Sequence, residues 1–166
     1  MKNLYLIRHA KSSWDHPQLP DFDRPLNKRG GKNAPEMGNR LKAREIFPDF
    51  VASSPAVRAR ETILRIANKI DFPSGRIVFM EEIYGAGTDT LLEVINEFPD
   101  EAELSFLVGH NPGITELTEY VTGASIGNIP TCGITSIEFN VDCWSHIGRE
   151  QGTLLFLDYP KKEFRL

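Results

Sequence analysis

Cysteine is scarce in this chain of 166 residues, and a strong net charge and long apolar runs are lacking too. Cys132 and Cys143 are too few to frame a domain of this size with disulfides, so we expect both to be reduced thiols. The formal net charge of −4 lacks the basic excess of most nucleic-acid-binding proteins. The apolar run from Leu4 to Ile7 is far too short for a signal peptide or a membrane span. We therefore expect a cytoplasmic protein with no nucleic-acid or membrane partner.

The histidines lack the spacing of a metal site. His9, His16, His110 and His146 form no HExxH pattern and no comparable pair of ligands. We therefore expect an activity that needs no metal and no other cofactor, and we keep a metal-dependent hydrolase only as an alternative.

The sequence alternates between strand patterns and helix patterns. Its length and composition, with 40% apolar and 25% charged residues, are those of one globular domain over residues 1–166. Strands are predicted at 4–7, 50–52, 77–80, 104–108, 134–141 and 153–157. Helices are predicted at 28–45 after the cap Asn27, after a cap at Ser53 or Ser54, at 88–98 and at 112–121. The predicted fold class is α/β, a single-domain three-layer sandwich with a mostly parallel central sheet, helices on both faces and an antiparallel strand at one edge.

Three of the predicted parallel strands end in polar clusters. RHAKSSW follows the first strand, SSPAVRARET follows the second and GHNPG follows the fourth. Ligands of such sheets bind beyond the carboxyl ends of the strands, where these segments meet. We therefore predict one site built from all three clusters.

The side chains in these clusters suit the transfer of a phosphoryl group. Arg8 and Arg58 carry planar guanidinium groups that match phosphoryl oxygens and stay charged at any working pH. His9 can act as the nucleophile, because a neutral imidazole is available at pH 7 while its second nitrogen donates to a fixed acceptor. His110 can donate to a phosphoryl oxygen, and Asn111 and the N–H groups of the helix that follows can add further donors.

Each of these features also has a simpler interpretation. A histidine after a buried strand is most often structural, helical arginines usually lie in solvent, and GHNPG can be only a tight turn into a helix. The coincidence of the three clusters favours the functional interpretation. Lys11, Ser12, Asp15, His16 and Arg24 either line the mouth of the site or belong to a solvated loop.

Four segments together carry a resemblance to a known family. With LIRHAKSSW, DRPLNKRG, SSPAVRARET and VGHNPGITEL, the sequence resembles the histidine phosphatase superfamily, also called the phosphoglycerate mutase-like family, over nearly its whole length. Ala10 stands where the family's Arg-His-Gly signature has glycine, which is similar to the short phosphohistidine phosphatase branch of the SixA type. The resemblance implies that His9 is the phosphorylated nucleophile and that Arg8, Arg58 and His110 form the phosphate pocket.

The resemblance leaves the proton donor and the substrate open. Larger members of the superfamily protonate the leaving oxygen with a carboxylate from the middle of the chain, where this sequence reads MEEIYGAGTD. Glu81 and Glu82 are candidates for that acid or ordinary surface charges. Imidazole leaves more easily than an alkoxide, and a short chain has little sequence for a lid. The predicted partner is therefore a protein carrying phosphohistidine, and a phosphatase of small phosphorylated substrates or a non-catalytic phospho-partner binding module stay as alternatives.

Overall fold

Six strands form the central sheet of the computed structural model, which describes all residues from 1 to 166. They are β1 (Lys2–Arg8), β2 (Phe50–Ser53), β3 (Val78–Phe79), β4 (Leu104–Gly109), β5 (Ile134–Phe139) and β6 (Gly152–Asp158). Their order across the sheet is β3-β2-β4-β1-β5-β6. The first four strands in that order are parallel, and β5 runs antiparallel to both of its neighbours. The mostly parallel sheet is confirmed, and its antiparallel edge is the β5–β6 pair.

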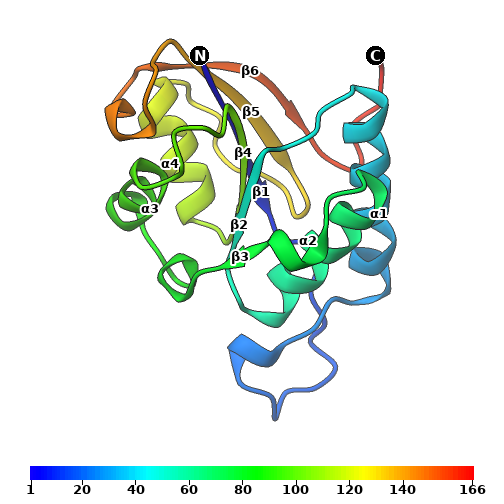
Figure 1. Cartoon of the computed structure of the whole chain (residues 1–166). Coiled ribbons are helices and arrows are strands. Elements are labelled where there is room, and N and C mark those ends of the chain that lie inside the picture. Colours follow the sequence, from blue (N-terminus) through cyan, green and yellow to red (C-terminus); the bar gives the residue numbers. More distant parts are fainter.

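Helices cover both faces of this sheet. Figure 1 shows α1 (Lys28–Ala43) and α2 (Val57–Lys69) on one face, and α3 (Thr88–Asn96) and α4 (Gly113–Thr122) on the other. Short 3-10 turns lie in the connections, namely η1 (Asp21–Asp23), η2 (Ser74–Arg76), η3 (Glu81–Ile83) and η4 (Trp144–His146). None of the helices combines the length and the apolar character that crossing a membrane requires. The predicted three-layer α/β sandwich is therefore the observed fold.

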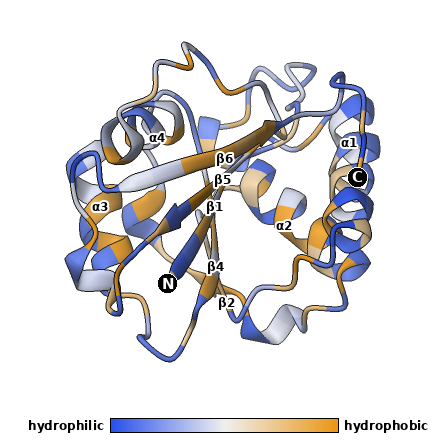
Figure 2. Ribbon diagram, turned by 90° about the horizontal axis from the view of Figure 1, so that it is seen from above, coloured by the Kyte–Doolittle hydropathy of each residue, from blue (hydrophilic) through white to orange (hydrophobic).

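The hydrophobic core has two halves, one on each face of the sheet. Along β1, Tyr5 and Ile7 belong to the half under α1 and α2, while Leu4 and Leu6 belong to the half under α3 and α4. This alternation is the two-residue period of a strand. Figure 2 shows apolar residues along the strands and on the helix sides that face them. Both halves of the core therefore fix β1, the strand that leads into His9.

The helix ends agree with the sequence at two positions and differ at a third. Asn27 caps α1 by accepting a hydrogen bond of 2.8 Å from an amide of its first turn, and Gly123 ends α4 with a left-handed φ of 74°. α2 begins only after Ala56, which stands at its N-cap position without a side-chain cap. The prediction that Ser53 or Ser54 caps this helix is wrong, because the Ser54 hydroxyl accepts from the Ala56 amide before the helix starts.

The carboxyl ends of β2, β4 and β1 meet at one edge of the sheet. The pairing registers place Arg8 opposite Gly109 and Ser53 opposite Val108. The three polar segments that follow these strands therefore leave the sheet side by side. The predicted convergence of the clusters is confirmed.

Candidate active site

His9 is fixed by hydrogen bonds to both neighbouring strand ends. Its amide donates to the carbonyl of Gly109 (3.1 Å), and its carbonyl accepts from the amide of Cys132 (2.9 Å). In the side chain, Nδ1 donates to the carbonyl of Ala10 (2.7 Å), since a carbonyl can only accept. Nε2 makes no hydrogen bond and is not among the buried unpartnered atoms. The ring therefore turns an unpaired Nε2 outward, although the residue as a whole is only 7% exposed.

Ala10 connects the nucleophile candidate to α2. Its amide donates to the hydroxyl of Thr62 (2.9 Å), which donates to the carbonyl of Arg58 (2.7 Å). Ala10 is fully buried and is not among the residues with positive φ, so an alanine fits this loop without strain. Thr62 therefore joins the loop after β1 to the helix turn that carries Arg58.

Both arginines of the predicted site have a buried Nε–H group without a partner, although Arg58 is buried and Arg8 is only partly buried. Arg8 donates from Nη1 to the carbonyl of Ile129 (2.9 Å), and Arg58 donates from both terminal nitrogens to Asp21. The Nε–H groups of Arg8 and Arg58 are buried and have no partner in the protein. Burying an unpaired charged donor is costly, so such groups are suited to hold an anionic ligand.

His110 faces His9, with the ring centroids 5.2 Å apart. Its Nε2 lies 2.7 Å from the hydroxyl oxygen of Ser54, which also accepts from the amide of Ala56 (3.2 Å). Ser54 can donate its proton to Nε2, and in that tautomer the imidazole proton of neutral His110 lies on Nδ1. Nδ1 is buried and has no protein partner. His110 therefore offers a third unpartnered donor to the site.

Both histidines are held in the neutral form. Burial, with added repulsion from His110 and the arginines, lowers the pKa of His9 from 6.5 to about 3. Burial and the nearby arginines likewise lower the pKa of His110 from 6.5 to about 4. A neutral His9 carries a free lone pair at pH 7, which is the state that a nucleophile needs.

Asp21 is a site residue that the sequence analysis did not single out. It accepts hydrogen bonds from Arg58, from the Tyr84 hydroxyl (2.7 Å) and from Arg24 (3.1 Å). These donors, with Tyr84 the largest contributor, hold the pKa of the Asp21 carboxyl well below its usual range. The segment DFDRP carries the signal, because it places two carboxylates next to an arginine in the loop after RHAKSSW.

Some of the candidate residues in the loop after β1 contact the Asp21 cluster, and others lie in solvent. Arg24 donates to the hydroxyl of buried Ser12 and stacks on the exposed Trp14 ring, with its guanidinium carbon 3.8 Å from the ring centroid. Asp15 and His16 are exposed. Arg24 and Ser12 therefore belong to the mouth of the site.

The amide of Asn111 is occupied by contacts within the protein. Its Nδ2 donates to Asn128 (2.9 Å) and to the carbonyl of Ile129 (3.1 Å), while its Oδ1 accepts from the amide and the hydroxyl of Thr115. The Ile129 carbonyl also accepts from Arg8. In this geometry Asn111 accepts from the first turn of α4 and holds the segment that anchors Arg8, rather than donating into the site as the sequence suggested.

Glu81 and Glu82 lie in η3, and both are exposed. Neither makes a hydrogen bond to His9, to His110 or to the arginines, and Glu82 lines a shallow hollow beside α3. The carboxylate that contacts the site is Asp21.

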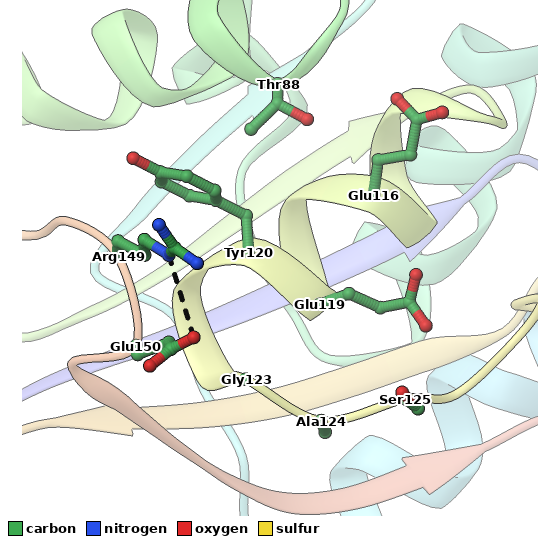
Figure 3. Close-up of a pocket in the computed structure, with 9 residues that line it drawn as sticks. All are labelled: Thr88, Glu116, Glu119, Tyr120, Gly123, Ala124, Ser125, Arg149 and Glu150. Carbon is green, nitrogen blue, oxygen red and sulfur yellow. Dashed lines mark ion pairs between the residues drawn. The ribbon is translucent and has the colours of Figure 1, made fainter.

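The largest hollow on the surface lies elsewhere. It is formed by α4 and the turn at Arg149 and Glu150, two neighbouring residues that make an ion pair of 3.6 Å with each other (Figure 3). Its lining is mainly acidic and polar, and none of the surface hollows is lined by His9, Arg8, Arg58 or His110. No group of three or more His, Cys, Asp or Glu side chains is arranged to hold a metal ion.

Known proteins match both the sequence and the fold. Residues 4–102 match the family described as Histidine phosphatase superfamily (branch 1). An uncharacterised chloroplastic protein of Arabidopsis thaliana is 32% identical over 152 residues, which cover 86% of this chain and 69% of the plant protein. A crystal structure from Agrobacterium tumefaciens, provisionally assigned as the phosphohistidine phosphatase SixA, superposes with a TM-score of 0.83 at 28% identity and covers 96% of this chain and 98% of that one.

A further solved structure shares the fold. It is that of the protein histidine phosphatase SixA complexed with tungstate, with a TM-score of 0.76, 21% identity and coverage of 95% of this chain and 97% of that one. The family match spans more than half of the chain, and the fold is shared over nearly all of it. The chain therefore belongs to the histidine phosphatase superfamily and is a phosphatase of that superfamily.

Proposed function

We propose that this phosphatase hydrolyses phosphohistidine on a partner protein, with His9 as the nucleophile and without a metal. One observation carries the proposal. His9 is fixed through Nδ1 on the Ala10 carbonyl, and its free Nε2 lies near Arg8, Arg58 and His110, which have buried donors without protein partners. An uncharged nucleophile beside cationic donors suits an anionic phosphoryl group.

In the first step, Nε2 of His9 attacks phosphorus in line with the bond to the leaving nitrogen. The P–Nε2 bond forms as the P–N bond of the substrate breaks, and the substrate ring, protonated on its other nitrogen, leaves as neutral imidazole with the electron pair of that bond. The unpartnered Nε–H groups of Arg8 and Arg58 stabilise the charge on the phosphoryl oxygens. Nδ1 of His9 keeps its proton and donates it to the carbonyl of Ala10, and this hydrogen bond stabilises the positive charge of the phosphorylated ring.

In the second step, water attacks phosphorus and the P–Nε2 bond breaks. His9 regains its Nε2 lone pair, and inorganic phosphate leaves with the oxygen of the water. His110 donates from Nδ1 to a phosphoryl oxygen in both steps, because Ser54 occupies its Nε2. The enzyme returns to its starting state without any cofactor.

The carboxylates around the site support a nitrogen leaving group. Asp21 is ionised, and Glu81 and Glu82 make no contact with the site residues. An alkoxide leaving group needs a general acid, an effect of about 10²- to 10⁴-fold, whereas imidazole leaves more easily. The provisional assignment of the Agrobacterium tumefaciens structure as a phosphohistidine phosphatase supports the same substrate.

The test is phosphate release from a histidine-phosphorylated carrier protein and from p-nitrophenyl phosphate, in excess chelator. Wild type is expected to prefer the carrier by kcat/KM, and His9→Ala is expected to lose turnover on both substrates. His146→Ala is the matched control, since His146 is an exposed histidine in η4, far along the chain from the segments that form the site. An alkaline quench followed by mass spectrometry is expected to find the phosphoryl group on His9.

Each other outcome points to a specific alternative. Preference for the ester would favour a phosphatase of small phosphorylated substrates. Turnover that survives in His9→Ala would refute the proposed nucleophile, and loss of activity in chelator would indicate a metal-dependent hydrolase. A wild type that binds the phosphorylated carrier without releasing phosphate would be a binding module.

A further inference from the structure

Asp21 holds the outer end of the Arg58 guanidinium. The backbone carbonyl of Asp21 accepts from Nη1 of Arg58 (2.7 Å), and its Oδ2 accepts from Nη2 (3.0 Å). The main chain and the side chain of Asp21 therefore bind both terminal nitrogens of Arg58. This contact crosses from η1 to α2, two segments that approach each other only in the folded chain.

These contacts with Asp21 leave the Nε edge of the Arg58 guanidinium available. A guanidinium has five N–H donors in a fixed plane, and Asp21 takes one from each terminal nitrogen. The Nε–H is buried and unpartnered. The Arg58 side chain is 7% exposed, whereas that of Asp21 is 53% exposed, so Asp21 lies on the solvent side of the guanidinium. The buried edge is then the one that can meet a phosphoryl group bidentately.

Asp21 is itself held in place by two further donors. The Tyr84 hydroxyl donates to Oδ2 (2.7 Å), and Arg24 donates to Oδ1 (3.1 Å). The Tyr84 ring stands edge-on to the rings of His110 and Phe22, with centroid distances of 5.5 Å and 5.1 Å. The position of Asp21 is therefore determined from several sides, which a residue that orients another one requires.

We propose that Asp21 is a positioning residue of the phosphoryl site, which sets the Arg58 guanidinium so that its Nε edge faces the phosphoryl group. The inference rests on the proposed function of His9 and Arg58. Neither the mechanism above nor the sequence clusters assign a role to Asp21. Its effect is exerted through Arg58 and not by contact with the reacting atoms.

The test compares Asp21→Ala, Asp21→Asn and Tyr84→Phe with wild type, and Asp23→Asn is the matched control. Asp23 is exposed in the same 3-10 turn and makes no side-chain hydrogen bond to the site. The measurements are the affinity for inorganic phosphate by calorimetry, and kcat and KM with p-nitrophenyl phosphate and phenyl phosphate.

Asp21→Ala is expected to weaken phosphate binding and to lower kcat/KM by about 10- to 100-fold, the range of a lost charged hydrogen bond and a misplaced donor. Asp21→Asn is expected to reduce phosphate binding and kcat/KM by a smaller factor, because its amide oxygen still accepts from Arg58 Nη2. Tyr84→Phe is expected to shift binding in the same direction by a smaller factor, and it keeps the test available if Asp21→Ala does not fold. The kcat/KM values for the two esters are expected to fall by the same factor, and Asp23→Asn is expected to have the wild-type phosphate affinity and kcat/KM.

Two results would overturn the inference. Tighter phosphate binding in Asp21→Asn would mean that the carboxylate competes with the phosphoryl group for Arg58. A loss confined to phenyl phosphate, which has the poorer leaving group, would make Asp21 a proton donor. Phosphate binding needs no turnover, so this measurement decides the role of Asp21 even if the phosphohistidine activity of the wild type fails.

Discussion

The acid side of the stability curve tests whether folding holds His9 uncharged, as the proposed attack requires. Burial lowers the pKa of His9 from 6.5 to about 3 in the folded chain. Between these two values the unfolded chain binds a proton at this histidine and the folded chain does not. The perturbation is a change from pH 8 to pH 5, applied to wild type and to His9→Gln.

The direction and size of the effect follow from this difference in bound protons. Because the unfolded state binds more protons in that window, the free energy of unfolding falls as the pH drops below 6.5, and it is unaffected by His9 above it. Each pH unit is worth about 1.4 kcal/mol, so His9 lowers the stability by about 2 kcal/mol at pH 5. His9→Gln abolishes this contribution, since an amide does not titrate and can still donate toward the Ala10 carbonyl.

Urea unfolding at several pH values between 8 and 5 measures the effect. The stability of wild type minus that of His9→Gln is expected to fall by about 2 kcal/mol over this range, and titrations shared by both proteins cancel in the difference. His146→Gln, at an exposed position, is expected to follow wild type. A difference between wild type and His9→Gln that stays constant with pH would refute the neutral His9.

Two further pairs of substitutions, each a test variant with its control, examine residues next to the site. Ser54→Ala is expected to lower kcat/KM by about 10-fold, the worth of one neutral hydrogen bond. It is also expected to shift part of the His110 population to the tautomer with the proton on Nε2, which nitrogen NMR spectra detect. Ser53→Ala is the control, because the Ser53 hydroxyl donates to a carbonyl, and it is expected to keep the wild-type kcat/KM and tautomer. Gly30→Ala is expected to lower the free energy of unfolding by about 1–3 kcal/mol in urea, because its Cβ would lie 2.1 Å from the carbonyl oxygen of Lys11. Gly31→Ala, which meets nothing within 4 Å in the same helix, is expected to gain about 0.5–1 kcal/mol. Unchanged activity in Ser54→Ala, or equal stability of the two glycine variants, would contradict these assignments.

The fold could be predicted from the sequence because its elements are strongly patterned. The apolar runs before His9 and His110 predict buried strands, and Asn27 and Gly123 predict helix ends. Each of these segments has the predicted structure. The cap of α2 could not be predicted in the same way. Ser54 is a good capping residue in isolation, but tertiary structure uses its hydroxyl for His110 and for the turn before the helix.

The contacts between the clusters could be predicted only in part. Strand order brings Arg8, His9 and His110 to one edge, and a parallel sheet makes that inference general. Asp21 was missed because its partner Arg58 comes from another element and its own loop has no periodic pattern. Asn111 was misjudged for the related reason that its partners, Asn128 and Ile129, lie in a distant irregular segment.

The site concentrates features that oppose stability, and this argues that they serve a ligand. Nε of Arg8, Nε of Arg58 and Nδ1 of His110 are buried polar atoms without partners, and an unsatisfied buried donor costs about 1–3 kcal/mol. A neutral buried His9 further weakens the fold at acid pH. Nε of Arg44 is likewise buried without a partner outside the site, so what points to a ligand is the grouping of three such atoms near His9. In the proposed mechanism one anionic phosphoryl group accepts from all three donors, so the residues that destabilise the free protein are the ones proposed to stabilise the transition state.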